Sequence, residues 1–230
     1  MPSDSLPPWD EVLSAAARLQ RIVPEAVLVG GTAAAIHAGH RFSRDADHVI
    51  PDLRERFDAI LAELESVAGW RTARVNRPVL ILGSLDGIET GIRQLIRDTP
   101  LETQEIVASG VRLRIPTPAE ILRIKAVLIL RRNATRDYVD LAALVDHTGP
   151  AAAVEALRKF DALYPQPDGG SALQQLVIQL ATPQPYDLEG TRLAEYRNLD
   201  PRWHEWAAVC AVLADLAARV LDGIPAAEGG

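Results

Sequence analysis

The chain has 230 residues, of which 48% are hydrophobic and 24% charged, and its formal net charge is −7 at pH 7. This length allows one large domain or two small ones, and the composition is that of a globular protein. A negative net charge disfavours a general nucleic-acid-binding protein, which is usually basic. The single cysteine, Cys210, excludes an internal disulfide and a cysteine-based metal site, so we expect a buried thiol.

Two further classes of protein are disfavoured by the hydropathy pattern. No apolar run approaches the roughly 20 residues that a membrane-spanning helix needs. The N-terminal stretch lacks a basic region followed by an apolar one, which a secretory signal would have. We therefore expect a cytoplasmic protein with no membrane partner.

The first half of the chain alternates strands and helices. Apolar residues at helical spacing predict helices at about 8–22, 32–40 and 54–67. Short β-branched runs bounded by glycine and proline predict strands at about 26–31, 46–50 and 110–116, and a hairpin around the turn at 83–87.

The pattern becomes helical after the Pro-Thr-Pro stretch at 116–118. Helices are predicted at about 119–132, 137–147, 151–163, 171–181 and 202–221. The sequence therefore predicts an α+β protein: a first domain over 1–115 with a mixed sheet and flanking helices, an α-helical domain over 116–222, and a disordered tail over 223–230.

A glycine pair marks the junction between the first predicted strand and the helix that follows it. Gly30 and Gly31 precede a helix start at Thr32. The N–H groups at a helix N-terminus attract anions, and glycines let a phosphate approach the backbone closely. The threonine hydroxyl can cap the helix or bond a phosphate oxygen. The alternative is a tight turn that needs glycine for packing alone.

Two aspartates lie at the start of the next predicted strand. Because alternate residues of a strand share a face, Asp45 and Asp47 should point the same way, with Ala46 and Val49 toward the core. Paired carboxylates suit hard divalent cations, which can clamp the oxygens of a phosphoryl transfer. The alternative is a solvated acidic pair.

The combination of these motifs resembles the signature of the nucleotidyltransferase (polymerase-beta-like) superfamily. In detail it is similar to the AbiEii-type toxins of bacterial abortive-infection and toxin–antitoxin systems, which include the MenT group. The first matching block comprises Gly30, Gly31, Thr32, Arg41, Ser43, Asp45 and Asp47. A second block, some eighty residues further on, comprises Lys125, Arg136, Asp137 and Asp140, with arginine at 136 where the family usually has lysine.

The resemblance implies a nucleotidyltransferase-like sheet domain and roles for the residues of the first block. The glycine pair and Thr32 would hold the triphosphate of a nucleotide, and Asp45 and Asp47 would hold Mg²⁺ or Mn²⁺ as catalytic residues. Arg41 would neutralise phosphate charge, and Ser43 would position the aspartate strand. Glu89 is the candidate for a third metal-binding carboxylate, but Gly91 lies on the same strand face and can take that place instead.

The second block would supply cations for the phosphates. Lys125 would contact phosphate, although a lysine in an apolar helix can also extend its ammonium toward solvent. Asp137 would orient Lys125 or Arg136, or act only as a first-turn acidic residue favoured by the helix dipole. Asp140 would otherwise be a solvated residue of the same helix. A zinc site among His37, His40 and His48 is not expected, because a glycine interrupts their helix and no cysteine accompanies them.

The function implied by the resemblance is metal-dependent transfer of a nucleoside monophosphate from a nucleoside triphosphate (NTP) to an acceptor hydroxyl. The implied acceptor is the 3′ end of a tRNA, and the implied role is that of a toxin with a cognate antitoxin protein. A protein or small-molecule acceptor remains an alternative, because the acidic composition suits RNA poorly and a fold does not determine a substrate. A second alternative is a degenerate protein that binds a nucleotide or a partner without transferase activity.

Overall fold

The computed structural model describes residues 7–223, which form two compact units. The first contains residues up to 36 and residues 42–117, and the second contains residues 37–41 and the chain from 118 onward. Residues 37–41, inside the predicted first domain, thus count with the second unit. The predicted disordered tail lies outside the described residues except for Gly223.

The first unit is built on a mixed five-stranded sheet with the strand order β1-β2-β5-β4-β3. Strands β2 and β5 are parallel, and the other neighbouring pairs are antiparallel. A separate antiparallel pair is formed by β6 and β7. The strands are β1 (Val27–Leu28), β2 (Ala46–Ile50), β3 (Trp70–Asn76), β4 (Leu80–Leu85), β5 (Ile88–Gln94), β6 (Thr103–Ala108) and β7 (Val111–Pro116).

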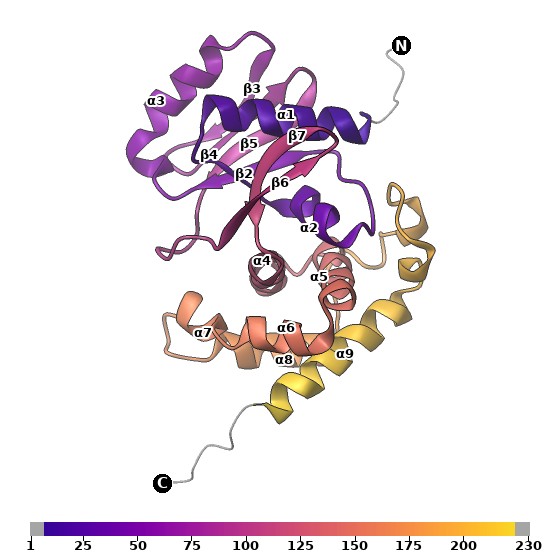
Figure 1. The fold of residues 1–230 in the computed structure, drawn as a ribbon. Coiled ribbons are helices and arrows are strands. Elements are labelled where there is room, and N and C mark those ends of the chain that lie inside the picture. Colours follow the sequence, from indigo (N-terminus) through magenta and orange to yellow (C-terminus); the bar gives the residue numbers. More distant parts are fainter. Residues whose placement is uncertain (1–6, 224–230) are drawn as a thin grey trace. The chain divides into compact units, whose positions relative to one another are not determined.

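Two helices, α1 and α3, pack against one face of this sheet. The helices of this part of the chain are α1 (Trp9–Ile22), α2 (Gly30–Ala38) and α3 (Leu53–Ser66). Helix α1 contacts β2, β5 and β7, and α3 contacts β3 and β5 (Figure 1). Leu19 of α1 and Phe57 and Ile60 of α3 form one apolar cluster with Ile50 and Ile92 of the sheet.

Two strands that the sequence did not predict, β3 and β6, have polar or weakly alternating sequences. Strand β3 forms an edge of the five-stranded sheet, and every residue after Trp70 is exposed. Because neither face of β3 is buried, it lacks the alternation by which strands are recognised. Strand β6 likewise alternates only between exposed and half-buried residues.

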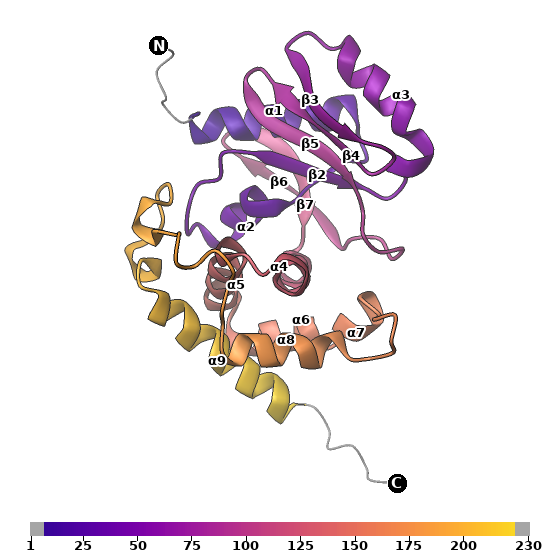
Figure 2. The ribbon, with the colours of Figure 1, turned by 180° about the vertical axis from the view of Figure 1, so that it is seen from behind.

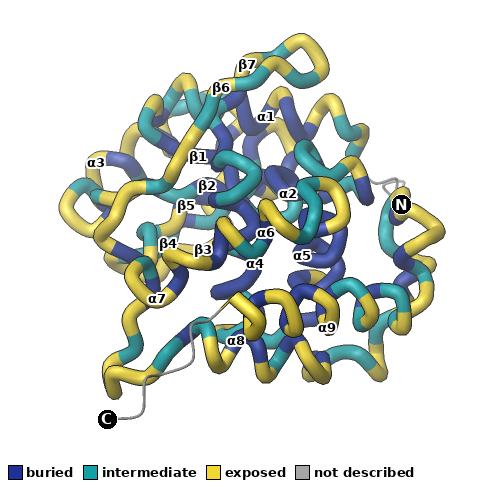
Figure 3. The backbone as a smooth tube through the Cα atoms, turned by 60° about the horizontal axis from the view of Figure 1, so that its bottom comes forward, coloured by how far each residue is buried: buried dark blue, intermediate teal, exposed yellow. Residues whose placement is uncertain are grey.

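The second unit is helical, as the sequence predicted. Its helices are α4 (Pro118–Arg132), α5 (Thr135–Thr148), α6 (Pro150–Leu157), α7 (Phe160–Leu163), α8 (Ala172–Ala181) and α9 (Trp206–Asp222), with short 3₁₀ turns at Leu193–Glu195 and Pro201–Trp203. Helices α8 and α9 pack side by side (Figure 2), and α5 is buried along most of its length (Figure 3). Gly149 ends α5 with φ +86°, and Pro150 begins α6, an arrangement that favours a sharp boundary.

Two expectations for this unit were wrong in detail. The single helix predicted at 151–163 is interrupted at Arg158 and Lys159, and Phe160 after the interruption is fully buried beside Tyr164. Cys210 on α9 is half-buried rather than buried. Between residues 7 and 223, no helix is both long and apolar enough to cross a membrane.

Candidate active site

The glycine pair begins helix α2 and lies directly against the aspartate strand. Gly30 has φ +71°, a left-handed conformation that glycine adopts without strain. A Cβ atom added to Gly30 would lie 3.6 Å from the Cβ of Asp47 and 3.8 Å from its Oδ2 atom. The backbone N–H of Val29 donates to the carbonyl of Asp47 at 2.8 Å. The start of α2 and the Asp47 carboxylate therefore share one small region of the first unit.

Two hydroxyl groups hold the segment that carries Asp45. The Oγ of Ser43 donates to Oδ1 of Asp45 at 2.6 Å, which orients the carboxylate. Thr32 is buried, and its hydroxyl donates to the backbone carbonyl of Asp45. Ser43 and Thr32 thus both hydrogen-bond the segment that carries Asp45.

Asp47 lies on the face of the sheet that α1 and α3 leave uncovered, and Asp45 immediately precedes its strand β2. Ala46, His48 and Ile50 are buried on the opposite face, whereas Asp45 and Asp47 are half-buried. Val49 was expected to face the core, but it lies two residues after Asp47 on the same strand face and is also half-buried. The carboxylates are therefore partly accessible, as a site for a charged ligand requires.

The neighbouring strand β5 brings a glycine, not a carboxylate, opposite Asp47. In the parallel register, Asp47 pairs with Gly91. Glu89 is exposed, and the described residues contain no group of three His, Cys, Asp or Glu side chains that could hold a metal ion together. The structure thus does not bring Glu89 together with Asp45 and Asp47 as a metal-binding triad. A side chain at Gly91 is also hindered, because a Cβ there would lie 2.6 Å from the carbonyl oxygen of Ile81.

This crowding leads to a prediction about Gly91. Replacement of Gly91 with Ala should lower the free energy of unfolding by about 1–3 kcal/mol, because the new methyl group meets backbone that cannot move aside freely. Urea-induced unfolding would measure the change. Gly190→Ala is a suitable control, since a Cβ there would come no closer than 3.9 Å to the carbonyl oxygen of Asp187. Equal stability of the two variants would show that β4 and β5 accommodate a side chain at position 91.

The donor set of the uncovered sheet face suits one divalent cation. Asp45 and Asp47 offer carboxylate oxygens, which Mg²⁺ and Mn²⁺ prefer as ligands. One of these carboxylates is oriented by a hydroxyl, and the other lies against the glycine backbone. These two residues would hold the ion. The backbone N–H groups at the start of α2 lie beside them and would be available to phosphate oxygens.

The residues of the second sequence block lie in the helical unit and form a buried network of charges. Lys125 on α4 is 1% exposed, and its ammonium lies 2.6 Å from Oδ2 of Asp140 and 3.2 Å from Oδ1 of Asp137. Asp137 also accepts hydrogen bonds from Arg132, whereas Arg136 is an exposed residue of the same helix. Asp137 therefore orients Lys125, and its second cation is Arg132, not Arg136.

Asp140 is the centre of this network and is not the solvated residue considered from the sequence. Its side chain is 0% exposed and accepts two hydrogen bonds from Arg41, at 2.7 and 2.9 Å. The Nε2 atom of His40 lies 2.7 Å from the same carboxylate. Burial alone would raise the pKa of Asp140, but Arg41, Lys125 and His40 together hold the pKa well below its usual value. The carboxylate is thus ionised and fully paired.

Lys125 and Arg41 were predicted to contact phosphate, and in the structure both contact the carboxylate of Asp140. Both cations are engaged with Asp140 in the described structure. Arg41 is 11% exposed, so its guanidinium is nearly removed from solvent. Their phosphate contacts remain predictions, and the observed role of both side chains is to neutralise a buried carboxylate.

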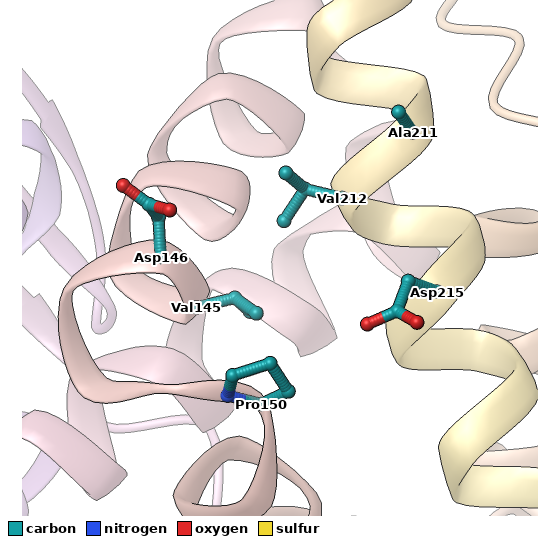
Figure 4. Close-up of a pocket in the computed structure, with 6 residues that line it drawn as sticks. All are labelled: Val145, Asp146, Pro150, Ala211, Val212 and Asp215. Atoms are coloured by element: carbon teal, nitrogen blue, oxygen red, sulfur yellow. The ribbon is translucent and has the colours of Figure 1, made fainter.

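A cavity of about 260 Å³ also lies within the helical unit, between the end of α5, the start of α6 and the middle of α9 (Figure 4). It is lined by Val145, Asp146, Pro150, Ala211, Val212 and Asp215. Its two carboxylates already have cationic partners, since Asp146 pairs with Arg202 and Asp215 with Arg219. The residues that resemble the family signature are not among those that line this cavity.

Comparison with known proteins identifies the family. The model of a family described as "Nucleotidyl transferase AbiEii toxin, Type IV TA system" matches residues 12–217. The chain belongs to the AbiEii toxin family of nucleotidyltransferases. The match spans both units and includes the glycine pair, both site aspartates and the Lys125 network.

Solved structures agree with this fold. A candidate nucleotidyltransferase from H. pylori superposes with a TM-score of 0.54 and 17% identity, covering 96% of this AbiEii chain and 97% of that one. ANT(2″)-Ia in complex with adenylyl-2″-tobramycin superposes with a TM-score of 0.50 and 13% identity, covering 66% and 97% of the two chains. At these identities the likeness shows a shared nucleotidyltransferase fold.

Curated relatives of similar sequence are much longer proteins. The heme uptake protein MmpL11 of Mycobacterium tuberculosis is 34% identical over 196 residues, which cover 77% of this AbiEii chain and 20% of that protein. The mycolic acid-containing lipids exporter MmpL11 of Mycolicibacterium smegmatis is 40% identical over 101 residues, which cover 43% and 11%. The chain thus spans about a fifth or less of the length of these relatives.

Proposed function

We propose that this AbiEii nucleotidyltransferase acts on RNA in a metal-dependent reaction and transfers a nucleoside monophosphate from an NTP to the 3′ end of a tRNA. The metal dependence is supported by Asp47, a half-buried carboxylate of β2 against the backbone of Gly30, and by Asp45, the half-buried residue immediately before that strand. Family membership supports nucleotidyl transfer itself and a role as the toxin of a toxin–antitoxin pair.

The proposed reaction uses the chain mainly for positioning and electrostatics. The N–H groups of Gly31 and its neighbours at the start of α2 bind the phosphates of the nucleotide. Ser43 orients the Asp45 carboxylate, which would hold the ion. Asp45 and Asp47 would hold a divalent cation, which would neutralise charge at the phosphate that is attacked. The acceptor hydroxyl attacks the α-phosphate and loses its proton to water, the bond from the α-phosphorus to the bridging oxygen breaks, and pyrophosphate leaves with the electron pair of that bond.

The test of this proposal compares acceptors and metals in one assay. Purified protein is incubated with each of four α-labelled NTPs, with Mg²⁺, Mn²⁺ or EDTA, and with total tRNA, tRNA with an oxidised 3′ end, or an aminoglycoside. We expect label in intact tRNA, little in oxidised tRNA, and none with EDTA. Label in the aminoglycoside instead would identify a small-molecule acceptor.

A second candidate function is nucleotide binding without transfer, which the glycine opposite Asp47 favours. No third carboxylate of the described residues joins Asp45 and Asp47. Fewer side chains are therefore available to accept a proton from the acceptor hydroxyl. The same incubation separates the two candidates. Retention of labelled NTP by the protein with every acceptor unlabelled would support the binding protein and refute the transferase.

A further inference from the structure

Arg93 is a charged residue of the uncovered sheet face to which the sequence assigned no role in the site. It belongs to β5 and pairs with Val49 in the parallel register, two residues beyond the pair formed by Asp47 and Gly91. Because paired residues of parallel strands point to the same face, Arg93 shares the face of Asp47. The intervening Ile92 is 0% exposed on the opposite face, which agrees with this orientation.

The guanidinium of Arg93 reaches back toward the carboxylate of Asp47. The Nη2 atom lies 3.7 Å from Oδ1 of Asp47, and the two side chains are 45% and 28% exposed. A pair this long and this exposed is weak, so it neutralises part of the carboxylate charge without holding either side chain firmly. Arg93 thus differs from Arg41, whose two short hydrogen bonds to Asp140 are shielded from solvent.

We propose that Arg93 is a polyphosphate-binding residue of this site, which exchanges its contact with Asp47 for a phosphate of the nucleotide. An arginine presents a planar fork of donors that matches phosphate oxygens. Its neighbour Gly91 has no side chain to stand between Arg93 and the Asp47 region. When Asp47 serves as a metal ligand, the guanidinium gives up a weak partner and gains a stronger, charge-assisted one.

The inference rests on the proposed function, because it assumes that polyphosphate and a divalent ion share the Asp47 site. It makes two binding predictions of opposite sign. Loss of Arg93 should weaken the binding of polyphosphate, since a charge-assisted contact is removed. The same loss should leave the binding of the ion alone unchanged or stronger, since a cation that competes for Asp47 is removed.

The experiment uses inorganic tripolyphosphate and Mn²⁺ on the full chain. Titration calorimetry in the presence of Mn²⁺ should show tripolyphosphate binding about 10- to 100-fold weaker in Arg93→Gln than in the unmodified protein. Electron paramagnetic resonance should show Mn²⁺ alone bound as tightly as before or up to about fivefold more tightly. Arg93→Lys should recover part of the tripolyphosphate affinity, because it keeps the charge but not the fork.

Arg74→Gln is the matched control. Arg74 is an exposed arginine on edge strand β3, separated from β5 by β4, and its loss should change neither titration. Melting temperatures of all variants should match that of the unmodified protein, because the Arg93 pair is weak and exposed.

The outcomes distinguish this inference from the proposed function. Equal tripolyphosphate affinity in Arg93→Gln and Arg74→Gln would overturn the inference even if tRNA is labelled normally. A weakened affinity confined to Arg93→Gln would support it even if no acceptor is labelled. An unmodified protein that fails to bind tripolyphosphate with Mn²⁺ would overturn it outright.

Discussion

Replacement of Asp45 with Asn should abolish nucleotidyl transfer while the protein stays folded. The substitution removes the charge of a proposed metal ligand, and loss of one such electrostatic contact costs about 10²- to 10³-fold in rate. The local structure should survive, because the amide oxygen still accepts the Ser43 hydroxyl and the backbone carbonyl still accepts the Thr32 hydroxyl. Transfer of labelled nucleotide to tRNA measures the first effect, and the melting temperature measures the second.

Glu89→Gln is the control for this experiment. Glu89 is an exposed carboxylate on the neighbouring strand and on the same sheet face, but it does not join the two aspartates in a metal-binding group. It should therefore retain activity within a few-fold. Inactivation of both variants to the same extent would restore Glu89 as a third ligand. A large drop in the melting temperature of Asp45→Asn would mean that the charge of Asp45 is structural.

Replacement of Asp140 with Asn should destabilise the protein by about 3–5 kcal/mol, which is the usual cost of removing one partner from a buried ion pair. The change leaves Arg41 without its carboxylate and Lys125 with Asp137 alone, both of them removed from water. Urea-induced unfolding at pH 7 measures the loss. The pKa of Asp140 is held below its usual value of about 4. The ionised carboxylate therefore contributes its full share of the free energy of unfolding above about pH 4. As the pH falls further, the difference between the two proteins should narrow.

Asp146→Asn, on the same helix, provides the comparison. Asp146 and its partner Arg202 are 40% and 51% exposed, so this pair should be worth no more than about 1 kcal/mol. Combining Lys125→Met with Asp140→Asn should cost less than the sum of the single changes, because one uncompensated charge is then removed. An Asp140→Asn protein as stable as Asp146→Asn would show that the buried network carries little energy.

The parts of the fold with one buried face were predictable. Helix α3 has Phe57, Ile60 and Leu64 at helical spacing, and all three are buried. Strand β2 was predicted at its observed bounds, because Pro51 ends the short run of residues that carries Asp47. Strand β3 was missed because an exposed edge strand leaves no such pattern. The interruption between α6 and α7 was missed because helix propensity alone continues through it.

The candidate site was predictable where its residues are close in the sequence. The glycine pair, Ser43 and the two aspartates lie within eighteen positions, and their contacts follow from one strand and one helix start. Arg93 depends on the register between β2 and β5, which the sequence does not specify locally. The burial of Asp140 has a signal in the sequence, since the apolar residues Val139 and Leu141 flank it in α5.

Residues 37–41 belong to the helical unit although they lie far upstream of it in the sequence, and this affects where the protein can be truncated. The sequence pattern becomes helical after Pro116, so a fragment beginning at Pro118 is an obvious choice for expressing the helical part alone. Such a fragment would lack His40 and Arg41, which contact Asp140 from far upstream. A truncation before Pro118 would therefore keep the buried Asp140 carboxylate and remove two of its hydrogen-bonding partners. The helical part is best expressed with the N-terminal half attached.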